Sequence, residues 1–139
     1  MAVRVFVYGT LKEGFRNFHI NRGTRVPGEF VTEAALPLYV IGEFGIPWLV
    51  HEPGQGHPVV GQVFEVDADT LAAMDVLERV SDGNWYRRLP LRVRPREGGV
   101  PVDVEAYFGT ASRLQQDTVH DGPLAEYTLA HQALFSDRW

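Results

Sequence analysis

Two segments of the sequence combine residue types that could do chemistry. The first is Tyr8-Gly9-Thr10-Leu11-Lys12, which follows an apolar run at the N-terminus. A strand that ends in Gly-Thr exposes consecutive backbone N–H groups where the chain turns, and such groups can bind an anion. A tight turn without a ligand fits the same spacing, so this pattern alone leaves both interpretations open.

The second segment contains Glu78, near the end of a predicted helix. At about 100° per residue, Leu71, Met74 and Glu78 fall on one stripe of that helix. Asp75 lies beside the stripe. A carboxylate on a packing face is either paired with an arginine or held in a pocket that tunes its ionisation. Because the chain has 12 arginines, both interpretations stay open at this point.

Other catalytic chemistries find little support in the sequence. The lack of cysteine excludes a disulfide framework, a cysteine nucleophile and a thiolate metal site. The five histidines show no zinc-binding spacing, and no serine stands in a nucleophile elbow. The glycines between residues 54 and 61 lead into a strand rather than a helix, so they do not predict a dinucleotide-binding loop.

The elements that must position these residues are mostly strands. Alternating or apolar runs predict strands over residues 3–8, 34–41, 46–51, 59–66, 86–94 and 102–108. Pro90 interrupts the fifth of them. The sequence predicts a short helical turn over residues 15–21 and weak helical character over residues 123–135. It predicts a strong helix over residues 71–80, with an N-cap signal from residue 67. This order predicts an α+β fold with a small, mixed, barrel-like sheet.

Size and charge narrow the class of protein further. The 139 residues fit one domain, and 45% hydrophobic with 22% charged residues is typical of a globular chain. A net charge of −5 argues against binding to nucleic acid or to an anionic membrane. The N-terminus has no signal-peptide pattern, and no apolar stretch approaches the ~20 residues that span a bilayer. We therefore expect a cytoplasmic protein, compatible with a monomer.

Together, the two segments resemble the γ-glutamyl cyclotransferase-like superfamily, and within it the γ-glutamylamine cyclotransferases. The resemblance rests on Tyr8-Gly9-Thr10-Leu11-Lys12 after a strand, and on Met74-Asp75-Val76-Leu77-Glu78 followed by Tyr86-Arg87-Arg88. It extends over residues 3–108 and includes Ile46-Pro47-Trp48-Leu49-Val50-His51. As a pair, the two motifs are more specific than either is alone.

The resemblance implies a mixed β-barrel-like core with flanking helices and a reaction that needs no cofactor and no metal. In that reaction a γ-glutamyl compound releases its amine while the glutamyl part cyclises to 5-oxoproline. Carried over by position, the residues implied to bind the glutamyl part are Tyr8, Gly9, Thr10 and Leu11. The implied general acid/base is Glu78.

The substrate stays open among several γ-glutamyl compounds. Residues 46–51 favour γ-glutamylamines such as γ-glutamyl-ε-lysine, whereas γ-glutamyl amino acids, glutathione or a biosynthetic intermediate would undergo the same chemistry. A non-catalytic γ-glutamyl-binding or interaction module is the alternative from another class of protein. In each enzymatic case the substrate's own α-amine attacks its γ-carbonyl, so no protein nucleophile is required. That agrees with the lack of cysteine.

Overall fold

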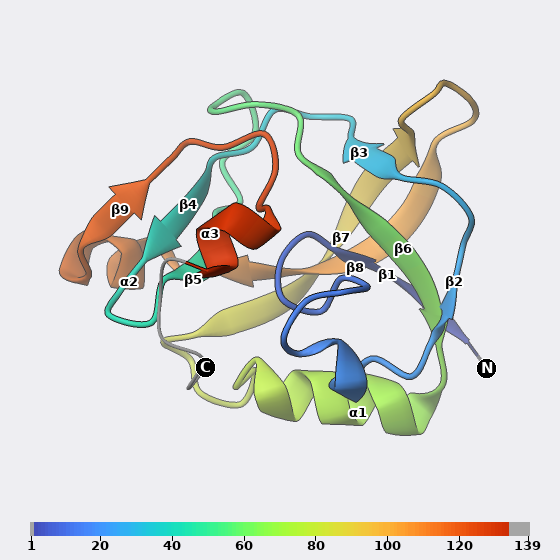
Figure 1. Cartoon of the computed structure of the whole chain (residues 1–139), viewed down its shortest axis with the longest axis horizontal. Helices are drawn as coiled ribbons and strands as arrows, with labels where there is room; N and C mark the ends of the chain where they lie inside the picture. Colours follow the sequence, from blue (N-terminus) through green and yellow to red (C-terminus); the bar gives the residue numbers. More distant parts are fainter. Residues whose placement is uncertain (1, 134–139) are drawn as a thin grey trace.

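Five strands close into a barrel in the computed structural model, which describes residues 2–133 (Figure 1). Around the barrel the hydrogen-bonded neighbours are β1 (Val3–Val7), β8 (Val102–Gly109), β7 (Tyr86–Pro95), β3 (Phe30–Thr32) and β6 (Val60–Val66), and β6 pairs back with β1. The β1–β8 pair is parallel and the others are antiparallel. The expected mixed barrel is therefore confirmed. A short strand, β2 (Thr24–Arg25), also pairs with β6.

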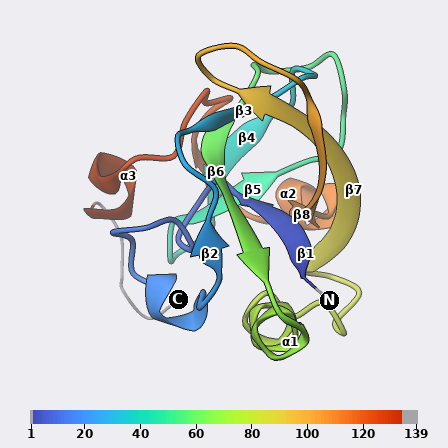
Figure 2. The same cartoon turned by 90° about the vertical axis from the view of Figure 1, so that its right-hand side faces the viewer.

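A smaller antiparallel sheet lies beside the barrel. It consists of β5 (Ile46–Leu49), β4 (Leu38–Ile41) and β9 (Val119–Asp121), and a bridge from Val50 to Gly109 joins it to the end of β8. The helical segments within residues 2–133 are η1 (Phe18–Ile20), α1 (Ala68–Leu77), α2 (Ala111–Gln116) and α3 (Leu129–Ala133). Figures 1 and 2 show α1 below the barrel, with α2 and α3 near the small sheet. None of these helices is long and apolar enough to cross a membrane.

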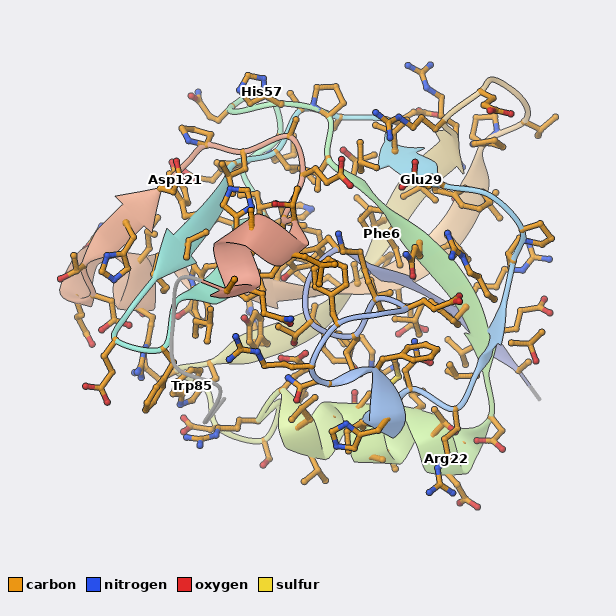
Figure 3. The ribbon with its side chains drawn as sticks, viewed as in Figure 1. Phe6, Arg22, Glu29, His57, Trp85 and Asp121 are labelled. Atoms are coloured by element: carbon orange, nitrogen blue, oxygen red, sulfur yellow. The ribbon has the colours of Figure 1, made fainter. Side chains whose placement is uncertain are left out.

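Alternation along the strands builds two packed layers. Phe6 of β1, Val63 of β6 and Ala106 of β8 belong to a cluster with members from all five barrel strands, which is the barrel interior. Figure 3 shows Phe6 among these strands. The neighbouring residue Val5 belongs to a second cluster, which includes Met74 of α1. The alternation predicted for the first strand therefore serves two buried faces, one of them covered by α1.

The helix α1 ends earlier than the sequence predicts, at residue 77 rather than 80, so that Glu78 is its C-cap. Arg79 then adopts the left-handed conformation, with φ of 53°. Two backbone hydrogen bonds of 3.1 Å close this turn, from Arg79 to Val76 and from Val80 to Asp75. This pattern is the Schellman ending, in which glycine usually occupies the left-handed position. Because an arginine stands there instead, the sequence carries no local signal for the ending.

The start of α1 agrees better with the sequence. The side chain of Asp67 accepts a hydrogen bond from the N–H of Thr70 at 2.8 Å, as an N-cap residue does.

The predicted interruption at Pro90 is wrong, because β7 stays in register with β8 and places Pro90 opposite Glu105. On its other side β7 pairs with β3 only over residues 93–95, so Pro90 lies at an edge, where proline is tolerated.

Candidate active site

The two sequence motifs meet at one pocket. The N-terminal loop enters it directly from β1, and Glu78 enters it from the end of α1. The pocket holds about 310 Å³ of space, counted out to the solvent. The residues that line it are Phe6, Val7, Tyr8, Gly9, Thr10, Leu11, Pro47, Glu78, Tyr86 and Tyr107. All five predicted site residues thus surround a single cavity, although about 70 residues separate the motifs.

Two buried asparagines hold the loop through its oxygen atoms. Asn17 donates from Nδ2 to the hydroxyl of Thr10 at 2.8 Å, and its N–H donates to the Thr10 carbonyl at 3.0 Å. Asn21 donates from Nδ2 to the carbonyl of Leu11 at 3.1 Å. The N–H of Lys12 donates to the carbonyl of Gly9 at 3.1 Å. Because the loop accepts in each bond from the asparagines, the N–H groups of Gly9, Thr10 and Leu11 remain for an anionic ligand as far as residues 2–133 are concerned.

Glycine is required at position 9 by a close approach rather than by an unusual turn. A Cβ atom on Gly9 would lie 2.5 Å from Cγ of Pro47, which is shorter than real contacts of this kind. The sequence pattern predicts that Gly9 lets the chain turn, but its φ is not in the left-handed region. The corner after β1 therefore packs directly on β5, and any side chain at position 9 would push the two apart.

Glu78 is a buried carboxyl group with an unsatisfied oxygen. Its residue is 7% exposed, and Oε2 finds no hydrogen-bond partner among the residues that the structure describes. Burial raises the pKa of Glu78 to about 8, with a smaller contribution from the negative charge of Asp75. No arginine in residues 2–133 pairs with Glu78. Of the two interpretations that the sequence leaves open, the geometry therefore supports a carboxyl group held in a pocket that tunes its ionisation. A carboxyl group with this pKa can accept and donate a proton near neutral pH.

Three tyrosines form the walls of the pocket and use their hydroxyl hydrogens inside the protein. Tyr8 donates to the carbonyl of Tyr107 at 2.5 Å, Tyr86 donates to the carbonyl of Pro47, and Tyr107 donates to Oδ1 of Asp75 at 2.6 Å. Burial raises the pKa of all three hydroxyls, so each stays neutral near pH 7. These bonds make Tyr8 part of a fixed wall.

An ion-pair network behind the pocket fixes Asp75. Arg88 approaches both carboxylate oxygens of Asp75, each at 3.1 Å, and its third nitrogen lies 2.5 Å from Glu105. A two-pronged arginine–carboxylate contact restricts rotation of both groups. It therefore orients the carboxylate that receives the hydroxyl of Tyr107.

Five lining residues were not predicted as site residues from the sequence: Phe6, Val7, Pro47, Tyr86 and Tyr107. Pro47 and Tyr86 stand inside segments that carry the family resemblance, so a signal for them existed. Tyr107 could have been placed opposite Arg88 by counting strand register from the Gly98-Gly99 turn. The contact of Tyr107 with α1 could not be obtained in that way.

The barrel and its glutamate-bearing pocket define the class of this protein. The crystal structure of a mouse AIG2-like protein has the same fold, with a TM-score of 0.73 and 31% identity over 91% of this chain and 88% of that one. The sequence profile described as "Gamma-glutamyl cyclotransferase, AIG2-like" matches residues 5–127, and the chain belongs to this family. Family membership implies a small γ-glutamyl substrate.

Curated relatives carry more specific names. The chain is 40% identical over 118 residues to the γ-glutamylaminecyclotransferase of Rattus norvegicus, and the aligned segment covers 78% of each protein. It is 44% identical over 93 residues to a Drosophila melanogaster relative, and the aligned segment covers 63% of this chain and 58% of that protein. The chain thus spans well under two thirds of the fly protein's length.

Proposed function

We propose that this chain is a cyclotransferase that cleaves a γ-glutamylamine to 5-oxoproline and a free amine, with Glu78 as general acid/base. One observation carries the proposal: the buried Glu78, whose Oε2 is unsatisfied, lines the same pocket as Gly9, Thr10 and Leu11 of the loop. The names of the mammalian relatives support γ-glutamylamines over other γ-glutamyl compounds.

The loop would hold the glutamyl end of the substrate. Its α-carboxylate needs hydrogen-bond donors, and the N–H groups of Gly9, Thr10 and Leu11 supply them without adding an acid to the pocket. The walls formed by Tyr8, Tyr86 and Tyr107 would keep the glutamyl chain folded, so that the α-amine approaches the γ-carbonyl to ~3–3.5 Å. Intramolecular attack then requires no protein nucleophile.

Glu78 would move protons, one at a time, from the entering to the leaving nitrogen. The ionised carboxylate takes a proton from the substrate's α-ammonium group, and the freed amine attacks the γ-carbonyl carbon. The new C–N bond closes the five-membered ring, and the bond from that carbon to the leaving nitrogen breaks. Glu78 gives this proton to the leaving nitrogen, and the regenerated carboxylate takes the second proton from the ring nitrogen, which becomes the amide N–H of 5-oxoproline. That second proton passes to the departing amine, which leaves as an ammonium ion, so that Glu78 is again ionised. A pKa of about 8 suits both transfers because it lies near that of an α-amine.

Release of 5-oxoproline from purified protein tests the proposal. The substrates are γ-glutamyl-ε-lysine, a γ-glutamyl amino acid and glutathione, each assayed with the wild type and with Glu78→Gln. We expect release by the wild type, most rapidly from γ-glutamyl-ε-lysine, and a loss of about 10²–10⁴-fold in Glu78→Gln. Glu52→Gln changes an exposed glutamate outside the pocket and serves as the matched control.

Two outcomes would contradict the proposal. Substantial turnover by a folded Glu78→Gln variant would remove the assigned acid/base. No 5-oxoproline from any substrate, together with binding of 5-oxoproline by the wild type, would instead favour a non-catalytic binding module.

A further inference from the structure

Tyr107 places a hydroxyl group between the barrel and the helix that carries Glu78. Its ring belongs to the packed layer that contains Val5 of β1 and Met74 of α1. Tyr107 is 3% exposed and lines the candidate active site. Its hydroxyl group reaches Asp75, which lies three residues before Glu78. Because residues three apart on a helix are neighbours, this hydroxyl group lies on the side of α1 that presents Glu78.

The hydrogen of this hydroxyl group has a fixed direction. Oη of Tyr107 donates to Oδ1 of Asp75 at 2.6 Å and makes no other hydrogen bond with residues 2–133. A short hydrogen bond from a hydroxyl group to a carboxylate is charge-assisted, so the hydrogen stays on that side. The oxygen still has a lone pair, and toward a ligand it can therefore act only as an acceptor.

Arg88 keeps Asp75 from turning away from Tyr107. Its Nε and Nη2 contact the two carboxylate oxygens of Asp75, each at 3.1 Å, and its Nη1 contacts Glu105 at 2.5 Å. Arg88 and Tyr107 stand opposite each other in the β7–β8 register, so both approach Asp75 from one position on the sheet. A fixed carboxylate polarises the hydroxyl group that donates to it, which makes the Tyr107 oxygen a stronger acceptor.

The other two pocket tyrosines lack a charged partner of this kind. Tyr8 donates to the carbonyl of Tyr107, and Tyr86 donates to the carbonyl of Pro47. A neutral carbonyl polarises a hydroxyl group less than a carboxylate does. Among the three hydroxyl groups, that of Tyr107 is therefore the best suited to accept a hydrogen bond from a cation.

The charges around this hydroxyl group also favour a cation. Burial raises the pKa of the Tyr107 hydroxyl, as do its hydrogen bond to Asp75 and the negative charges of Asp75 and Glu78. The positive charge of Arg88 acts in the opposite sense, but this arginine is paired with both Asp75 and Glu105. A positive group between Tyr107 and Glu78 would therefore meet a negative potential.

We propose that Tyr107 is a catalytic residue whose hydroxyl oxygen accepts a hydrogen bond from the substrate's α-ammonium group and holds that nitrogen beside Glu78. The inference rests on the proposed function. An ammonium group has three N–H donors, so one can face Glu78 while a second faces Tyr107. The α-carboxylate on the same carbon atom then meets the N–H groups of residues 9–11. After Glu78 has taken one proton, a remaining N–H keeps the bond to Tyr107, and the nitrogen lone pair attacks the γ-carbonyl.

Two compounds that differ only in the α-amine isolate this contact. γ-Glutamyl-n-pentylamine carries the amine, whereas the mono-n-pentylamide of glutaric acid lacks it and cannot cyclise. Each is titrated calorimetrically into Glu78→Gln, in which turnover is slowed, and into the double variant with Tyr107→Phe. We expect Tyr107→Phe to weaken binding of the first compound about 10- to 100-fold, as for loss of a hydrogen bond to a charged group. Binding of the glutaric acid compound should change less than twofold, which also shows that the pocket is intact.

The matched control is Tyr127→Phe in the same Glu78→Gln background. It removes a buried hydroxyl group that donates to the carbonyl of Gly45 at 3.4 Å, outside the pocket. This variant should keep both affinities within twofold. Equal weakening of both compounds by Tyr107→Phe would show that the residue only shapes the pocket, and would overturn the inference. An unchanged affinity for the first compound, or no binding of either compound, would also overturn it.

Failure of the proposed function is detected separately. If the wild type releases no 5-oxoproline from γ-glutamyl-n-pentylamine or γ-glutamyl-ε-lysine, the proposed reaction fails. The two affinities still test the contact, because neither measurement requires turnover. Selective weakening of the amine-bearing compound by Tyr107→Phe would then support Tyr107 as the acceptor for the α-ammonium group in a binding pocket.

Discussion

Tyr107 donates its hydroxyl hydrogen to Asp75 at 2.6 Å, and its own carbonyl accepts the hydroxyl of Tyr8 at 2.5 Å. One residue of β8 thereby ties the end of α1 to the loop that follows β1. Asp75 lies three residues before Glu78, on the adjacent turn of the helix. The position of the carboxyl group in the pocket thus depends on a contact between a helix and a barrel strand.

Removing the charge of Asp75 should lower the pKa of Glu78. In Asp75→Asn the acceptor for Tyr107 remains, but the negative charge that raises the pKa of Glu78 is gone. Because the proposed reaction needs ionised Glu78, kcat/KM of the wild type should rise with pH through the pKa of Glu78. In Asp75→Asn this acid limb of the pH profile should move to lower pH by up to about one pH unit. The control is Asp103→Asn, on the exposed end of β8. An acid limb that stays in place in Asp75→Asn would contradict the assignment.

Glu78 should make folding less favourable as the pH rises. Its folded pKa of about 8 lies above the model-peptide value of 4.5, so the folded state binds more protons than the unfolded state between these values. The stability associated with the neutral form is complete below about pH 4.5 and is lost as the pH rises through about 8. Glu78→Gln is neutral at every pH. Its Tm should therefore exceed that of the wild type by several degrees at pH 8.5 and by much less at pH 5.

Scanning calorimetry of both proteins across this range measures the effect. A Tm difference that does not grow with pH would show that Glu78 is not buried as described.

Adding one methyl group at position 9 should disturb the pocket. The Cβ of Gly9→Ala would press on Pro47, and overpacking of this kind costs about 1–3 kcal/mol. We expect a lower free energy of unfolding, measured by urea titration, and a raised KM. Gly83→Ala is the matched control, since a Cβ there has no neighbour within 4 Å. If Pro47→Ala in the same chain does not relieve the loss, the contact is not its cause.

Lys12 should give the opposite pH slope to Glu78. It is 3% exposed, donates from Nζ to the carbonyl of Tyr127 and lies 4.3 Å from the ring centroid of Phe15. Burial lowers the pKa of Lys12 from 10.5 to about 8, so the folded state binds fewer protons between these values and stability rises with pH across that window. Lys12→Met has no such group.

The free energy of unfolding of the wild type and of Lys12→Met is measured at pH 7.5 and 9.5. Relative to Lys12→Met, the wild type should be more stable at pH 9.5 than at pH 7.5. An unchanged difference would place the pKa of Lys12 near its ordinary value.

Local patterns in the sequence account for several elements and for both halves of the site. The alternation at residues 3–8, the N-cap at Asp67 and the turn at Gly98-Gly99 depend on interactions a few residues long, which is why they could be predicted. The short strands β2 and β3 were missed because two or three residues carry too little pattern of their own. Only their pairing with β6 and β7 makes them strands.

The sequence by itself determined which residues are candidates for the site, Glu78 and residues 8–11, because those residue types at that spacing resemble the family's motifs. Only the tertiary structure decided how these residues are arranged and how deeply they are buried. The left-handed turn at Arg79, the packing of Gly9 on Pro47 and the bond from Tyr107 to Asp75 each join segments or conformations that no local pattern encodes. Burial by the closed barrel raises the pKa of Glu78, because desolvation depends on what surrounds a group rather than on its neighbours in the chain.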